Sequence, residues 1–158
     1  MRLREKPGSM RQFLAGLFVV AFALNWWWEM LQMPAFIEMM DRPWRATALL
    51  CTFAGLGDAA ITLMIFAMVA LATRRCHWAV AGQWPPYLAA ALSGAAVAVA
   101  IEKAALAAGY WTYSGRMPVV PALGVGLVPL LQLMLLVPFA IRLSAWWLSP
   151  RQSDRGNG

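Results

Sequence analysis

The sequence predicts an all-α, polytopic transmembrane four-helix bundle. Of its 158 residues, 61% are hydrophobic and only 13% are charged, whereas water-soluble domains are about half apolar and a quarter charged. Four apolar segments are each long enough to cross a bilayer, which takes about 20 residues of helix. The remaining residues leave no room for a separate soluble domain.

The four helices are placed by the apolar runs and by the residues that interrupt them. The predicted spans cover about residues 13–33, 46–72, 87–109 and 122–143. Pro34 stops the first run, Arg74 begins the basic stretch that stops the second, and a pair of prolines precedes the third. Pro129 and Pro138 predict a kink in the fourth, because a proline cannot donate a helical hydrogen bond.

The segments outside these helices are expected to be loops and a tail. No segment shows the alternation of apolar and polar residues that a half-buried strand requires. Residues 149–158 read as a disordered tail. Residues 1–148 are therefore expected to form a single transmembrane domain.

The distribution of basic residues predicts the orientation. Nine lie on one side of the predicted helices: Arg2, Arg4, Lys6, Arg11, Arg74, Arg75, Arg142, Arg151 and Arg155. Three lie on the other side: Arg42, Arg45 and Arg116. Basic loop residues concentrate on the cytoplasmic side of membranes. The chain is therefore predicted to be a multi-pass protein of the bacterial inner membrane with both termini in the cytoplasm.

Tryptophans near the predicted helix ends agree with this orientation, because tryptophan favours the membrane–water interfaces. The inner interface is expected to hold Trp78, Trp84, Trp146 and Trp147, and the outer interface Trp44 and Trp111.

The net charge of +6 does not predict nucleic-acid binding, because the arginines flank apolar runs and form no patch between aromatic strands. The expected partners are membrane lipids, a hydrophobic small molecule, and further copies of the chain or a larger membrane complex.

A signal-peptide cleavage site is suggested by Ala21-Phe22-Ala23, which follows a basic start and an apolar stretch. The apolar character continues to Met33, so we expect the first helix to be retained.

No cofactor or metal is predicted. Cys51 and Cys76 are expected near opposite ends of the second helix, too far apart to pair. Cys76 and His77 alone provide too few ligands for a zinc site.

The most informative residues are polar side chains inside the predicted spans, where ionisable groups are costly and usually functional. Four are ionisable: Glu29, Asp58, Glu102 and Lys103. Three are amides: Asn25, Gln32 and Gln132. The helical rise places all seven in the outer half of the membrane or at its midplane.

These residues predict a polar pocket that opens outward. Asn25, Glu29 and Gln32 share one stripe of the first helix, because they stand four and three residues apart. Glycines beside Asp58 are expected to allow close packing of a neighbouring helix. The aromatic rim is expected to contain Trp26, Trp27, Trp28, Tyr110, Trp111 and Tyr113.

Three carboxyls in such a pocket could hold or donate protons, so Glu29, Asp58 and Glu102 are the candidate catalytic residues. An aromatic rim suits an apolar substrate that passes through a developing cation. The candidate substrate-binding residues are Asn25, Trp28, Gln32, Lys103, Tyr110, Trp111, Tyr113 and Gln132. The alternative is structural: Glu29 or Glu102 pairs with Lys103 and locks the bundle, while the tryptophans form an interfacial belt.

Two short stretches resemble membrane cyclases. Asn25, Trp28 and Glu29 resemble the Asn-x-x-Trp-Glu element of small membrane terpene cyclases of the fungal meroterpenoid type. Glu102, followed by residues 109–113 and two prolines, resembles a pattern in heterodimer-type lycopene cyclases. In those families, intramembrane acids protonate an alkene or epoxide, which implies Glu29 and Glu102 as the acids here.

The resemblance to lycopene cyclases ends after Pro129, where Leu130-Leu131-Gln132 stands in place of a paired acidic motif. The terpene cyclases are also longer, with seven helices. As a whole, the chain resembles a small bacterial four-helix integral-membrane family. The features that carry this resemblance are the Trp28–Pro34 run, Gly57-Asp58, Tyr113-Ser114 and Met117-Pro118.

Three hypotheses for the function follow. The first is an enzyme that acts on an isoprenoid or other lipid by general acid chemistry. The second is a small proton-coupled transporter that works as an oligomer, which the midplane Asp58 and the proline-containing fourth helix favour. The third is a non-catalytic subunit or assembly factor of a membrane complex, which would need the carboxyls only as paired groups.

Overall fold

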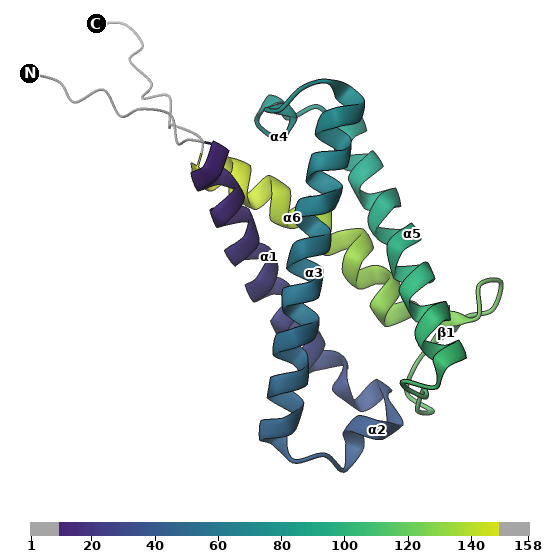
Figure 1. The fold of residues 1–158 in the computed structure, drawn as a ribbon. Helices are drawn as coiled ribbons and strands as arrows, with labels where there is room; N and C mark the ends of the chain where they lie inside the picture. The colour runs from purple at the N-terminus through teal and green to yellow at the C-terminus, as the bar shows by residue number, and fades with distance from the viewer. Residues whose placement is uncertain (1–9, 149–158) are drawn as a thin grey trace, which may run out of the picture.

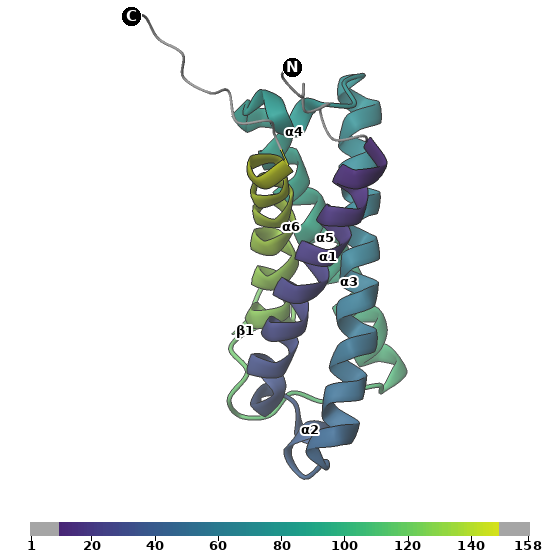
Figure 2. The same cartoon turned by 90° about the vertical axis from the view of Figure 1, so that its left-hand side faces the viewer.

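The computed structural model describes residues 10–148. Its four long helices are α1 (Met10–Gln32), α3 (Trp44–Thr73), α5 (Trp84–Ala108) and α6 (Leu127–Leu148). They run lengthwise beside one another, and α1 and α6 bring the two ends of the described chain to the same end of the bundle (Figures 1 and 2). Each is long and apolar enough to cross a membrane. The predicted all-α bundle of four such helices is confirmed.

Short elements connect these helices. A 3-10 turn η1 (Met33–Ala35) and helix α2 (Ile37–Met40) join α1 to α3, while helix α4 (Trp78–Ala81) joins α3 to α5. Strands β1 (Val119–Val120) and β2 (Val125–Gly126) form an antiparallel pair before α6, with Val119 opposite Gly126. The expectation of no strand is therefore wrong at this hairpin, because two-residue strands are too short to show an alternating pattern.

The predicted helix boundaries need two corrections. Helix α5 begins at Trp84 and takes the two following prolines into its first turn, where a missing N–H has no helical partner to lose. Helix α6 covers Leu127–Leu148 rather than 122–143, because the hairpin occupies the preceding residues. Pro129 consequently lies in the first turn, and Pro138 lies in the helix interior. The predicted tail, 149–158, falls outside the described residues.

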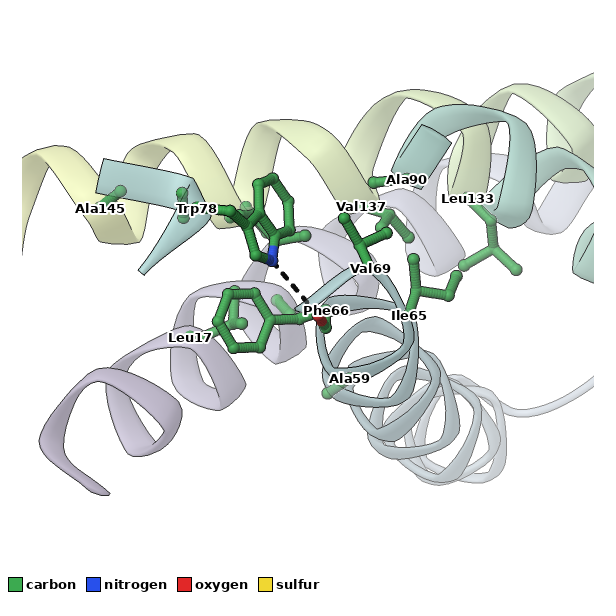
Figure 3. Close-up of a cluster of buried hydrophobic side chains, with 14 of the residues drawn as sticks. Leu17, Ala59, Ile65, Phe66, Val69, Trp78, Ala90, Leu133, Val137 and Ala145 are labelled. Atoms are coloured by element: carbon green, nitrogen blue, oxygen red, sulfur yellow. Dashed lines mark hydrogen bonds between the residues drawn. The ribbon is translucent and has the colours of Figure 1, made fainter. Parts of the chain in front are cut away.

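The apolar core fills the half of the bundle next to α4. Figure 3 shows Leu17 of α1, Phe66 and Val69 of α3, and Val137 of α6 converging on Trp78. Trp78 was predicted at the inner interface, but only 1% of its surface is exposed. Its ring stacks on Phe66, with centroids 5.5 Å apart, and its Nε1–H donates to the Phe66 carbonyl at 3.4 Å. Trp78 is therefore a core residue.

The two glycines expected to promote packing beside Asp58 differ in their surroundings. A Cβ on Gly55 would lie 3.3 Å from the backbone nitrogen of Trp26, so α1 and α3 approach closely there. A Cβ on Gly57 would meet nothing within 4 Å. Gly55 therefore serves helix packing, whereas Gly57 faces open space.

Gly94 lies where α5 and α6 approach each other closely. A Cβ at this position would overlap the carbonyl group of Leu133, so α5 and α6 touch backbone to backbone. We expect Gly94→Ala to destabilise the protein by about 1–3 kcal/mol, the usual effect of overpacking a core. Thermal unfolding in detergent, followed by tryptophan fluorescence, measures this effect. Gly57→Ala is the matched control and should keep at least the wild-type melting temperature, because alanine is the better helix former. Equal melting temperatures for the two variants would contradict the close α5–α6 contact.

Candidate functional site

The side-chain amide of Gln132 is the centre of a buried polar cluster. Its Nε2, which carries two hydrogens, lies within hydrogen-bond distance of three acceptors: Asn25 Oδ1 at 3.1 Å, Glu29 Oε1 at 2.9 Å and Asp58 Oδ2 at 2.8 Å. Its Oε1 accepts a hydrogen bond of 3.2 Å from Gln32 Nε2. Five predicted site residues from α1, α3 and α6 therefore form one hydrogen-bonded cluster.

Local helical geometry positions these side chains. Asn25 is fully buried and donates its Nδ2–H to the Ala21 carbonyl one turn earlier, at 2.9 Å, which turns its Oδ1 toward Gln132. Asn25, Glu29 and Gln32 lie on the same face of α1, as their spacing predicted. The Thr62 hydroxyl donates to the Asp58 backbone carbonyl at 2.8 Å, on the same face of α3.

The Gln132 cluster restricts the charge that it can hold. The Glu29 and Asp58 oxygens are both within hydrogen-bond distance of one nitrogen, so they can be no farther apart than the two bond lengths combined. Two carboxylates this close, in apolar surroundings, repel each other strongly. The arrangement therefore favours one proton shared by the pair.

Glu102 is held separately from the Gln132 cluster. Its Oε2 accepts a hydrogen bond from the Tyr113 hydroxyl, and the Tyr113 oxygen in turn accepts the Gly126 backbone N–H at 2.7 Å. Burial, followed by this contact with Glu102, raises the pKa of Tyr113 above its usual range, so its hydroxyl stays protonated and able to donate. Tyr113, predicted to bind substrate, is thus placed to orient Glu102.

A cavity of about 500 Å³ joins the two groups of acids. Glu29, Asp58 and Glu102 all line it, together with Gln32 and Gln132. Most of the other lining residues are apolar: Met33, Phe36, Met39, Leu50, Phe53, Ile61, Ile101 and Leu133. This volume and this mixture of many apolar and few polar groups are typical of small-molecule sites.

One end of the cavity lies at α2 and the loop after α5. Glu38, Met39 and Arg42 line it from α2 and the turn that follows, and Tyr110 and Trp111 line it from the loop. The Glu38 carboxylate accepts the Thr112 backbone N–H at 2.9 Å, and this bond lowers the pKa of Glu38. Glu38 and Arg42 were missed because their sequence positions place them in a loop, where charged residues are expected.

The side-chain oxygen of Gln32 has unused hydrogen-bonding capacity in the cavity wall. It is buried and makes no hydrogen bond within residues 10–148. Gln32 lies beside Glu29, so this acceptor is available to a polar group on a bound molecule. The buried Nε1–H of Trp111 lies beside Glu102.

Several predicted site residues lie elsewhere. Lys103 is exposed, and Glu102 bonds to Tyr113. Trp28 lines a second hollow of about 330 Å³, beside Leu31 and Arg116. Two further members of the predicted rim also lie off the cavity: Trp26 donates to Thr52 at 3.2 Å, and Trp27 is 63% exposed. Of the predicted aromatic rim, Tyr110 and Trp111 line the cavity itself.

The site residues do not include a constellation for a metal ion. Within residues 10–148, no group of three or more His, Cys, Asp or Glu side chains is arranged to bind one. The site therefore consists of carboxyls, amides and a phenol around an apolar cavity.

A comparison with known proteins finds no relative of this chain. Nothing matches this chain among protein-family models, curated proteins or solved structures.

Gln132 should be the residue on which the cluster depends. We expect Gln132→Leu to lower the free energy of unfolding by about 1–3 kcal/mol, because three buried acceptors lose their donor. Denaturant unfolding in detergent measures this loss. The double variant Gln132→Leu/Asp58→Asn should recover part of it, since one buried carboxyl is then removed. A single variant as stable as the wild type would show that the amide does not hold the carboxyls.

Proposed function

We propose that this chain is a membrane enzyme that performs general acid chemistry on an isoprenoid or other lipid-like molecule. The observation that carries the proposal is that carboxyls from three helices line one mainly apolar cavity. Acids that serve only as structural pairs need no cavity, whereas acids that protonate a substrate must face a space that the substrate can occupy.

The proposed reaction is a proton-catalysed isomerisation or cyclisation. The acid O–H transfers its proton to an alkene carbon, the π electrons form the new C–H bond, and a carbocation remains on the neighbouring carbon. Attack by another double bond of the same molecule, or migration of the charge, is followed by loss of a proton to the carboxylate. The acid is regenerated, so substrate and product have the same mass and no co-reactant is consumed.

We assign Glu102 as the proton donor. Tyr113 binds one carboxyl oxygen, Oε2, which leaves Oε1 for the proton that is transferred. The Glu29–Asp58 pair in the Gln132 cluster is the second store of a proton on the same cavity. Trp111 also lines the cavity, where an aromatic ring can stabilise a cation.

The contacts favour this function over the alternatives. Structural pairing with Lys103 receives no support, because Glu102 bonds to Tyr113 and Lys103 is exposed. A transporter would need a polar route through the whole bundle. The half next to α4 is instead filled by Leu17, Phe66 and Trp78.

Glu102→Gln should abolish the chemistry while keeping the fold. A general acid contributes about 10²–10⁴-fold to a rate, and a loss of this size is expected because an amide cannot replace the proton. The test uses proteoliposomes with a panel of linear polyenes and their terminal epoxides, and mass spectrometry detects products of unchanged mass. Asp41→Asn, at an exposed position off the cavity, is the matched control and should keep full turnover. Full turnover by Glu102→Gln, or no conversion of any substrate by the wild type, would contradict the proposal.

We further propose that both termini lie in the cytoplasm of a bacterial inner membrane, so that the α2 end of the cavity faces outward. This rests on the nine basic residues on the side of the termini. Five of those nine lie outside the described residues.

A native cysteine tests the orientation. Cys76 is exposed in the turn between α3 and α4. A membrane-impermeant maleimide should label it only after intact spheroplasts are permeabilised. In a Cys76→Ser background, Gly115→Cys should show the opposite pattern; a Cβ at Gly115 meets nothing within 4 Å. The reverse result at both positions would invert the topology.

A further inference from the structure

We propose that the cavity receives its occupant sideways from the bilayer, through an opening between α3 and α5, and that the absence of a side chain at Gly57 keeps this opening clear. The occupant is a membrane-dissolved molecule with a linear apolar chain. This inference rests on the proposed function, and it adds the route and the class of molecule.

Residues of the cavity wall on α3 and α5 are themselves exposed. Phe53 of α3 is 64% exposed and Ile101 of α5 is 39% exposed, and both line the cavity. Gly57 is also an exposed lining residue. Residues that are exposed and also line the cavity mark its rim, and this rim lies on two helices that are long and apolar enough to cross a membrane.

The packing of the helices is looser between α3 and α5 than between the other neighbouring pairs that α1, α5 and α6 form. Helix α1 packs along α3 and α6, and α5 packs along α6, whereas α3 and α5 touch over a shorter stretch. Figure 1 shows α3 and α5 diverging toward the end that carries α2. The acids lie on this same cavity, so a molecule admitted between α3 and α5 reaches Asp58 and Glu102 directly.

The lateral opening and the α2 end of the cavity differ in the polarity of their residues. The lateral opening presents Leu50, Phe53 and Ile101, whereas the end at α2 presents Glu38 and Arg42. A long apolar chain is most soluble in the bilayer. Passage along charged groups would take it out of these apolar surroundings and would cost hydrophobic free energy. The lateral opening is therefore the favourable route.

Gly57 lines this opening, and a side chain at this position would project into free space. Gly57→Leu should narrow the passage without a clash, and leucine also favours the helix more than glycine does. Ala60→Leu is the matched control: it adds the same group on the exposed surface of α3, at a residue that does not line the cavity. Met39→Trp instead obstructs the end at α2.

The test measures how fast an apolar probe loads into the cavity. Donor vesicles deliver a photoactivatable hexadecanol, with a diazirine in mid-chain, to proteoliposomes that contain each variant. A light flash at successive times crosslinks the bound probe, and mass spectrometry locates the labelled peptides. We expect saturable labelling of α3 and α5 in the wild type. Loading should slow about tenfold or more in Gly57→Leu, and the Ala60→Leu and Met39→Trp variants should stay near the wild-type rate.

Slower loading in Met39→Trp together with an unchanged rate in Gly57→Leu would overturn the lateral route. An unchanged rate in both variants would also overturn it. The proposed function fails separately: the Gly57 pattern could hold while Glu102→Gln keeps full turnover, and then the route stands without the acid chemistry. An absence of saturable labelling in the wild type would remove both proposals.

Discussion

The arrangement of this protein depends on one constraint: acidic groups held inside an apolar bundle must have hydrogen-bond partners. A single amide, Gln132, supplies one to both Glu29 and Asp58. Because these residues belong to α1, α3 and α6, the hydrogen bonds that satisfy the acids also connect three helices. The cost of leaving a buried polar group without a partner makes this arrangement specific as well as stabilising.

The remaining acid is partnered by a different part of the chain. Glu102 takes Tyr113 from the loop after α5, and the Gly126 N–H fixes the Tyr113 oxygen from the hairpin. The loop is in turn connected to the turn after α1, since Ser114 N–H donates to the Ala35 carbonyl at 2.9 Å. The hairpin that displaces the start of α6 therefore helps to hold the Tyr113 hydroxyl at the third carboxyl, through the Gly126 N–H.

The bundle is divided along its length into an apolar half and a polar half. In the half near α4, aromatic and aliphatic side chains pack around Trp78 without polar groups from the acid clusters. In the other half, the acids line a cavity between α3 and α5. The proposed function makes use of this division: the closed half would give rigidity and the open half would admit the substrate, because packed helices hold functional groups more precisely than loops do.

The sequence by itself determined the four helices that are long and apolar enough to span a membrane, and it singled out the polar residues within them, since long apolar runs and ionisable groups inside them are local signals. It could also place Asn25, Glu29 and Gln32 on one face, because helical spacing alone decides that. Only the tertiary structure decided that Gln132 joins Glu29 to Asp58, that Glu102 pairs with Tyr113 rather than Lys103, and that Gly57 faces a cavity while Gly55 faces a helix. The rotation and separation of the helices set these contacts, and they arise from packing between segments up to about a hundred residues apart.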